Sequence, residues 1–219
     1  MLRKIIFIGQ SSDNVIYFDI KNKTILKAQK NSLLDMEKTK NNTKNIVIIL
    51  VTIPVVLSIV TGIVQISLGK MYYSHAVLIL LAILWIIEAT FLTYILEKAL
   101  YGPIKHKSLE EIQKGTKEEF RQASRGNNLW NIFGDKKVTH GKKVIMWILV
   151  ISISTLTISI LPMIYAINKE GQLLGHQVGS EIILLSMLGV MPFICILLIF
   201  INNPIRWLVI VEKYQKRKL

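Results

Sequence analysis

The chain has 219 residues and a net charge of +13, and 52% of its residues are hydrophobic. A basic balance of this kind suggests a nucleic-acid-binding protein, but the apolar residues gather into long runs, each of about 20 residues or more, the length that crosses a bilayer. A soluble domain of this size has no interior that could bury these runs, so the sequence excludes an ordinary soluble protein and predicts an integral membrane protein. The predicted spans are Ile46–Leu68, Ala76–Leu96, Val144–Ile167 and Ile182–Ile201.

The N-terminal region, residues 1–44, is predicted to be a cytoplasmic β-rich segment followed by a linker. The runs Lys4–Ile8, Val15–Ile20 and Thr24–Lys27 are rich in β-branched and aromatic residues and are separated by turn-forming residues. A meander this small buries little core by itself, so we expect it to lean on the membrane surface, on the 98–143 loop or on a partner. It serves either as a cap on the helices or as a recognition module.

The distribution of positive charge predicts the orientation of the spans. Of the 27 lysines and arginines, only Lys70 and Lys169 lie in the 69–75 turn and the 168–181 loop. Because cytoplasmic loops of membrane proteins carry the excess of Lys and Arg, both termini and the 98–143 loop are predicted to be cytoplasmic. The fold class predicted is membrane all-α: a four-helix transmembrane bundle made of hairpins 45–100 and 144–202. Tyr72 and Tyr73 are expected to anchor the outer edge of the second span.

Glu88 lies about 18 Å into the second span, near the middle of the bilayer. An ionisable group there costs at least about 2.5 kcal/mol on insertion, so it is expected to face the bundle interior and to have polar partners. Nearby hydroxyls in the second and third spans complete a predicted intramembrane polar site: Thr90, Thr93, Ser152, Thr155 and Ser159. Two interpretations remain open: a toxin- or ion-binding site, and a structural polar clamp that fixes helix register.

The cytoplasmic loop 101–143 is predicted to contain a short helix. Its start is placed at the capping-box pattern of Ser108 to Glu111, its apolar face includes Ile112 and Phe120, and it ends near Gly126. An apolar cluster follows, and the tail 203–219 begins with Pro204, which suits the first turn of a new amphipathic helix along the inner membrane surface. The predicted membrane-surface or partner patch comprises Leu129, Trp130, Ile132, Phe133 and Trp207.

No enzymatic chemistry, cofactor or metal is predicted. The four histidines are scattered over both sides of the predicted membrane without metal-ligand spacing: His75, His106, His140 and His176. The Glu110-Glu111 and Glu118-Glu119 pairs lie in the charged loop, away from any histidine in a span. The expected partners are the lipid bilayer and a protein, and no nucleic acid.

Two segments carry a family resemblance: Val15 to Ile20, which reads VIYFDI, and Trp207 to Tyr214, which reads WLVIVEKY. Together with the layout of a β-rich start, a helical hairpin, a basic loop and a Lys-rich tail, they resemble small membrane proteins of the tandem five-transmembrane type from Gram-positive bacteria. The resemblance implies a bacterial cell membrane protein. The richness of the chain in Ile, Lys and Asn is a separate hint of a bacterial genome rich in A and T. Some relatives of this type are immunity proteins against membrane-depolarising toxins delivered by type VII secretion.

Three functions are compatible with these features. The first is a non-enzymatic immunity protein that binds a membrane-acting toxin within the bilayer, through the polar site and the proline-interrupted spans (Pro54, Pro162 and Pro192). The second is a small transporter or permease subunit that uses Glu88. The third is a scaffold or sensor subunit that acts through residues 1–30 and the Trp130 cluster.

Overall fold

The computed structural model describes residues 3–11, 14–30, 72–105, 112–127, 137–169, 173–179 and 181–216. The first predicted span, the linker before it, the Ser108 capping pattern and Leu129, Trp130, Ile132 and Phe133 lie outside the described residues. The chain divides into two compact units. We call Met1–Thr39, Tyr94–Ser152 and Ile196–Leu219 the sheet unit, and Lys40–Thr93 with Ile153–Cys195 the helical unit.

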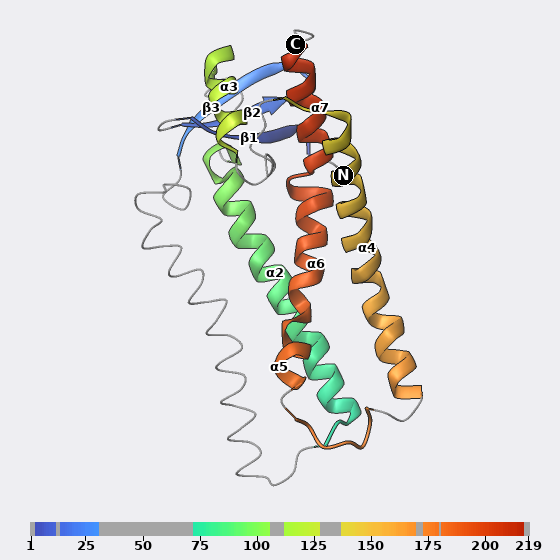
Figure 1. Cartoon of the computed structure of the whole chain (residues 1–219). Coiled ribbons are helices and arrows are strands. Elements are labelled where there is room, and N and C mark those ends of the chain that lie inside the picture. Colours follow the sequence, from blue (N-terminus) through green and yellow to red (C-terminus); the bar gives the residue numbers. More distant parts are fainter. Residues whose placement is uncertain are drawn as a thin grey trace. The chain divides into compact units, whose positions relative to one another are not determined.

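The sheet unit contains a four-stranded antiparallel sheet with strand order β1-β2-β3-β4 (Figure 1). The three predicted N-terminal strands are confirmed as β1 (Ile5–Ser11), β2 (Asn14–Asp19) and β3 (Thr24–Gln29). The β2–β3 turn is closed by the Asp19 carboxylate, which accepts hydrogen bonds from the backbone amides of Lys21 (2.8 Å) and Asn22 (3.2 Å). The fourth strand, β4 (Gln113–Lys114), is two polar residues long and has no hydrophobic pattern that would predict it.

Helix α3 (Lys117–Gly126) packs against β1 and β2. The prediction that one helix contains both Ile112 and Phe120 is wrong, because residues 113–114 form a strand. The Gly115 amide continues the pairing with β3 by donating to the Ile25 carbonyl (2.9 Å). The capping box is formed instead by Thr116 and Glu119. The predicted end near Gly126 is confirmed.

Glycine at position 9 permits the close packing of α3 on β1. A Cβ atom at Gly9 would overlap the Ala123 carbonyl oxygen, and the strand register shifts between Phe7 and Gly9. The sheet therefore meets the backbone of α3 at a position where no other side chain fits.

Helix α7 (Pro204–Gln215) begins as the sequence predicts, with Pro204 in the first turn and the Asn203 carboxamide oxygen capping the amides of Ile205 and Arg206. Its apolar side, however, is not a free surface. Trp207 is 2% exposed, and its indole Nε1 donates a 2.8 Å hydrogen bond to the Ile8 carbonyl of β1. The placement of Trp207 on a membrane-surface patch is therefore corrected: the residue belongs to the core of the sheet unit.

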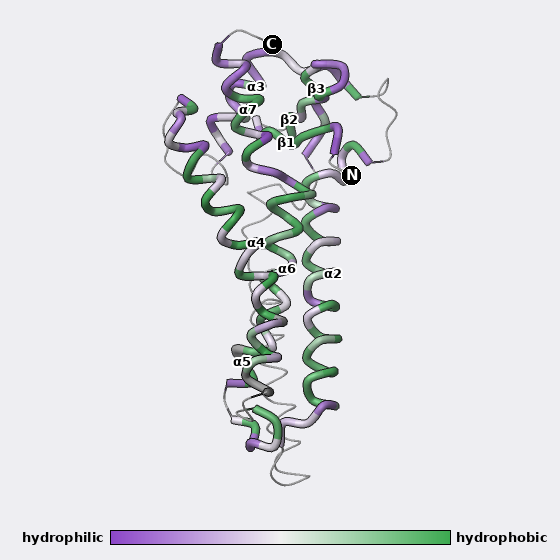
Figure 2. The backbone as a smooth tube through the Cα atoms, turned by 90° about the vertical axis from the view of Figure 1, so that its right-hand side faces the viewer, coloured by the Kyte–Doolittle hydropathy of each residue, from purple (hydrophilic) through white to green (hydrophobic). Residues whose placement is uncertain are grey.

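Three stretches of the described residues are long and apolar enough to cross a membrane: His75–Lys105, His140–Ala166 and Met187–Gln215. They contain α2 (His75–Lys105) and most of α4 (His140–Lys169), which cover the second and third predicted spans. Figure 2 shows apolar residues along α2, α4 and α6 (Val190–Ile196). The predicted fold class is confirmed at this level, a mostly helical chain with an N-terminal antiparallel sheet.

The fourth predicted span is not one uniform helix. It consists of α5 (Glu181–Ser186), the 3₁₀ turn η1 (Met187–Gly189), α6 (Val190–Ile196) and the π-helical turn η2 (Leu197–Ile201). Apolar length alone predicts the segment but not these changes of helical winding, which depend on what each turn packs against.

We expect the hydrogen bonds at the Ile8 carbonyl to be strongly coupled. This oxygen accepts from both Trp207 Nε1 and Asn127 Nδ2, the latter at 2.6 Å. Trp207→Phe or Asn127→Ala alone should cost about 1 kcal/mol for the bond, because the carbonyl keeps one donor. The double variant should cost more than the sum, since the carbonyl is then buried without a partner. Thermal unfolding in detergent, followed by far-ultraviolet circular dichroism, measures this; simple additivity would contradict it.

Candidate functional site

Glu88 is the buried carboxyl group of the helical unit. It lies in α2, its residue is 7% exposed, and its Oε2 atom has no hydrogen-bond partner. Buried polar atoms normally have a partner, and an unpaired carboxyl oxygen is more costly than an unpaired neutral group. The predicted inward position of Glu88 matches the structure, but the predicted hydrogen-bonding partner for this oxygen does not appear among the described residues.

The absence of a side chain at Gly189 in η1 makes room for Glu88. A Cβ atom there would overlap Glu88 Oε2 and would lie 2.7 Å from Trp85 Cα and 2.9 Å from the Trp85 carbonyl oxygen. A hydrogen bond joins α2 to α5 (Glu181–Ser186) beside this position: the Trp85 indole Nε1 donates to the Leu185 carbonyl at 2.6 Å. The carboxyl group is therefore enclosed between α2 and the 3₁₀ turn.

The two threonines of α2 that are predicted to belong to this site, Thr90 and Thr93, differ in burial. Thr90 is exposed, whereas Thr93 is half-buried and its Oγ1 is enclosed without a hydrogen-bond partner. A threonine in a helix commonly satisfies its hydroxyl by bonding back to a carbonyl one turn earlier. Thr93 and Glu88 thus each carry an enclosed, unsatisfied polar atom in the same helix.

The hydroxyls of α4 divide between two faces. Thr157 Oγ1 donates to the Ile153 carbonyl (2.8 Å), with the Met191 carbonyl at 3.4 Å, and Ser154 Oγ lies 3.7 Å from Cys195 Sγ. These residues contact α6.

Ser152, Thr155 and Ser159 are exposed instead. We call these three residues the hydroxyl row. Ser159 donates back to the Thr155 carbonyl (2.8 Å), while the hydroxyls of Ser152 and Thr155 have no hydrogen-bond partner among the described residues. No hydrogen bond connects Glu88 to the row. The residues predicted as one polar site are therefore a buried carboxyl and a separate exposed row.

A polar link closes the end of the helical unit where α2 begins. The Tyr73 hydroxyl donates a 2.8 Å hydrogen bond to Glu181 Oε1, which also accepts from the Gly179 amide at 2.8 Å. Burial raises the pKa of Tyr73, while the Gly179 amide lowers the pKa of Glu181. Tyr72 is 51% exposed, as expected for an interfacial anchor, but Tyr73 is buried. An aromatic pair at a span end does not by itself reveal which ring turns inward.

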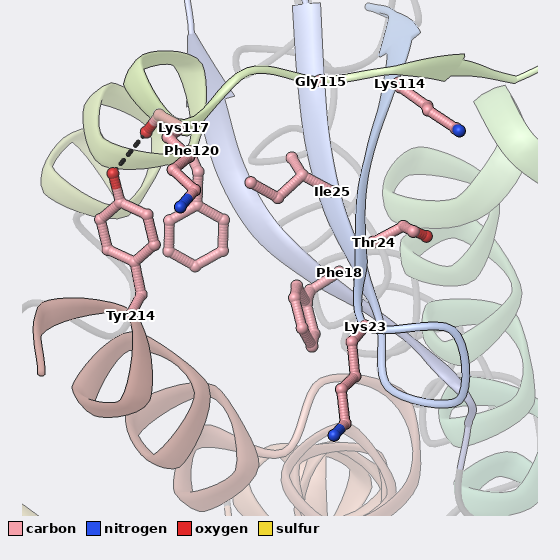
Figure 3. Close-up of a pocket in the computed structure, with 9 residues that line it drawn as sticks. All are labelled: Phe18, Lys23, Thr24, Ile25, Lys114, Gly115, Lys117, Phe120 and Tyr214. Atoms are coloured by element: carbon pink, nitrogen blue, oxygen red, sulfur yellow. Dashed lines mark hydrogen bonds between the residues drawn. The ribbon is translucent and has the colours of Figure 1, made fainter. Parts of the chain in front are cut away.

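The sheet unit contains a pocket of about 250 Å³ between the β2–β3 hairpin, α3 and α7 (Figure 3). Its wall is aromatic: the rings of Phe18 and Phe120 lie 6.3 Å apart, and those of Phe120 and Tyr214 lie 4.5 Å apart. The Tyr214 hydroxyl donates a 2.6 Å hydrogen bond to the Lys117 carbonyl, which fixes the ring against α3. Three lysines also line the pocket: Lys23, Lys114 and Lys117.

An ion pair supports the β3–α3 side of this pocket. Lys27 Nζ lies 2.9 Å from Glu119 Oε1, and Glu119 Oε2 accepts the Thr116 amide at 2.8 Å. These bonds, that of Lys27 foremost, hold the pKa of Glu119 below its usual range. Glu119 thus joins the helix cap to the neighbouring strand.

Within the described ranges, no group of three or more His, Cys, Asp and Glu residues is placed to hold a metal ion. Comparisons with protein-family models, with curated proteins and with solved structures give no match to this chain.

Lowering the pH should weaken the contact between α3 and β3. Because the folded-state pKa of Glu119 is depressed, its stabilising contribution is present above the unfolded pKa of about 4.3 and is lost as the pH falls through the lower folded value. Glu119→Gln should therefore lower the unfolding temperature at pH 6, and its difference from the wild type should disappear once the pH has fallen below the folded-state pKa of Glu119.

Glu118→Gln is the matched control, since it removes the same charge from the same helical turn but loses only a 3.8 Å contact with Arg121. Circular dichroism melts in detergent across the pH range give the comparison. Parallel pH profiles for Glu119→Gln and the wild type would rule out this role of Glu119.

Proposed function

We propose that this chain is a non-enzymatic, multi-pass protein of the bacterial cell membrane, with both termini in the cytoplasm, that protects the cell by binding a membrane-acting toxin within the bilayer. The long apolar helices support the membrane location. The concentration of lysine and arginine in the sheet unit and in the loop before α4 supports the orientation.

The hydroxyl row of α4 is the observation that carries the proposal. Large apolar side chains surround it and are themselves exposed, among them Ile151 (56%), Leu156 (56%) and Ile158 (73%). In hydrocarbon, an exposed hydroxyl finds no water, and its alternatives are its own helix backbone or a neighbouring helix. A face of this kind combines apolar packing with polar groups that an incoming helix can engage.

Binding at this face provides a simple mode of protection. A toxin that depolarises a membrane must assemble apolar segments into a conducting structure within the bilayer. Occupation of one such segment by α4 would withhold it from that assembly, and no covalent step is required. The sheet unit would then hold the cytoplasmic ends of α2 and α4 in place while the intramembrane face is engaged.

Removal of the hydroxyl row should reduce protection. The near-isosteric set Ser152→Ala, Thr155→Val and Ser159→Ala deletes two or three cross-helix bonds of about 0.6 kcal/mol each, which corresponds to an eightfold to twentyfold loss of toxin affinity, to order of magnitude. The measurement is survival and membrane potential of a sensitive host that expresses this chain together with a membrane-depolarising toxin, taken from the neighbourhood of its gene if one is encoded there.

The control is Ser154→Ala with Thr157→Val, which removes hydroxyls from the α6-facing side of the same helix. Membrane levels of each variant must equal those of the wild type. Failure of the wild-type chain to protect the host would end the proposal, and equal loss in both variant sets would show that the hydroxyl row is not the contact surface.

Glu88 favours a second candidate, a small transporter or permease subunit. An enclosed carboxyl oxygen without a partner in α2 is able to take up a proton or a small cation, which a hydrogen-bonded clamp residue would not do. Gly189 has no Cβ that would overlap Glu88 Oε2, so the carboxyl group packs directly against η1. The observation concerns α2 and η1 only, and it is independent of the hydroxyl row.

Ion-coupled transport would depend on this carboxyl group. In liposomes with an imposed proton or sodium gradient, Glu88→Gln should abolish flux while Thr90→Val, a change at an exposed position of the same helix, leaves it intact. If the purified protein shows no flux and Glu88→Gln only lowers the unfolding temperature, Glu88 is structural and the transporter proposal fails.

A further inference from the structure

We propose that the pocket of the sheet unit binds an acidic segment of a cytoplasmic protein, by accepting one apolar or aromatic side chain that is flanked by carboxylates. This inference concerns the sheet unit alone and does not depend on toxin binding.

The electrostatics of the pocket define the charge of the ligand. Lys23, Lys114 and Lys117 come from the β2–β3 turn, from β4 and from the first turn of α3, and all three are exposed. None of them forms an ion pair with another described residue. Lys27, which is also on β3, is neutralised by Glu119, so the unpaired positive charge at the pocket itself comes from these three lysines.

The pocket interior defines the rest of the ligand. Figure 3 shows the rings of Phe18, Phe120 and Tyr214 around the space, with Ile25 on the strand side. Phe120 is fully buried beneath it, and Tyr214 is held by its bond to α3, so the wall is formed by residues that the fold fixes. A preformed aromatic wall takes up a single anchor side chain at low entropic cost.

The size of the pocket argues against a cofactor or nucleotide. About 250 Å³ lies below the range of roughly 300–1,000 Å³ that is typical of small-molecule sites. A space of this size suits one large side chain, with the neighbouring carboxylates of the same peptide outside it, where the lysine ammonium groups lie.

The position of the pocket along α7 favours a protein over a lipid headgroup. Tyr214 lies ten residues beyond Pro204, or about 15 Å along the helix. The headgroup layer on each side of a bilayer is only about 5–8 Å thick. If α7 continues in the direction of the proposed span, which ends before Pro204, Tyr214 is carried past the headgroups into the aqueous phase, where a protein segment reaches the pocket more readily than a lipid headgroup does.

The test uses the full-length protein in a non-ionic detergent and a fluorescein-labelled peptide in which one phenylalanine is flanked by two glutamates on each side. Fluorescence anisotropy should show saturable binding that weakens with salt. Replacement of the phenylalanine by glycine, or of the glutamates by lysines, should weaken it at least about tenfold. If the glycine peptide binds equally well, the apolar pocket is not the site and the proposal is wrong.

Charge-neutral variants locate the binding surface. The triple variant Lys23→Gln, Lys114→Gln and Lys117→Gln should bind the phenylalanine peptide about tenfold more weakly. The matched triple Lys4→Gln, Lys21→Gln and Lys137→Gln, which removes the same charge from exposed lysines outside the pocket, should bind normally. Unfolding temperatures establish that both variants are folded. Equal weakening in the two would show unspecific charge attraction and overturn the proposal.

A lipid competitor completes the experiment. Liposomes with about 30% phosphatidylserine should leave peptide binding unchanged, whereas liposomes of phosphatidylcholine alone serve as the reference. Displacement of the peptide by the anionic liposomes only would identify the pocket as a lipid-headgroup site and would refute the assignment to a protein partner.

Discussion

The sheet unit depends on a small set of tyrosine hydrogen bonds that join the N-terminal strands to the ends of apolar helices. Tyr17 of β2 donates to the Leu100 carbonyl of α2 (2.7 Å). Tyr101, one residue later, accepts the Phe7 amide of β1 (3.3 Å) and donates to the Ile201 carbonyl at the end of η2 (2.9 Å). Burial raises the pKa of Tyr17, so this phenol remains a neutral donor at all physiological pH values. A sheet of this size buries too little core to be stable by itself, and these bonds attach it to the end of α2 and to η2.

Packing of the same strands on α3 and α7 completes the unit and creates the pocket. Gly9 lets α3 approach β1, Trp207 fixes α7 to β1, and the aromatic wall of the pocket forms where the hairpin, α3 and α7 converge. The pocket is thus a consequence of how the sheet is held. Changes to its wall residues should affect stability and binding together, whereas changes to its lysines should affect binding alone.

The long helices α2 and α4 differ from the sheet, because most of their exposed side chains are apolar and polar side chains are few. Glu88 and Thr93 are enclosed without partners, whereas the hydroxyl row is exposed among large aliphatic side chains. In a bilayer, lipid does not satisfy the enclosed carboxyl oxygen of Glu88, and an exposed hydroxyl bonds either to its own helix backbone, as Ser159 does, or to a neighbouring helix. The two candidate functions correspond to these two arrangements: a helix partner for the row, and a proton or cation for the carboxyl group.

Local sequence patterns determined much of the architecture. Hydropathy identified the long apolar helices of the described residues, β-branched runs with turn residues identified β1 to β3, and Asn203-Pro204 identified the start of α7, because each of these features depends on neighbours within a few residues. The inward position of Glu88 also followed from its place in an apolar segment.

Only the tertiary structure decided which polar residues share a site and which aromatic residues are covered. Ser152, Thr155 and Ser159 lie on one face of α4 by spacing, but spacing does not reveal that α6 contacts the other face. Trp207 has the sequence context of an interfacial residue and is nevertheless buried by β1, which precedes it by about 200 residues. Likewise, β4 exists only because the edge of β3 offers it hydrogen bonds, and the pocket joins strands, α3 and α7 from distant parts of the chain. Contacts between segments so far apart leave no periodic signal in the sequence, because they are specified by complementary surfaces and not by neighbouring residues.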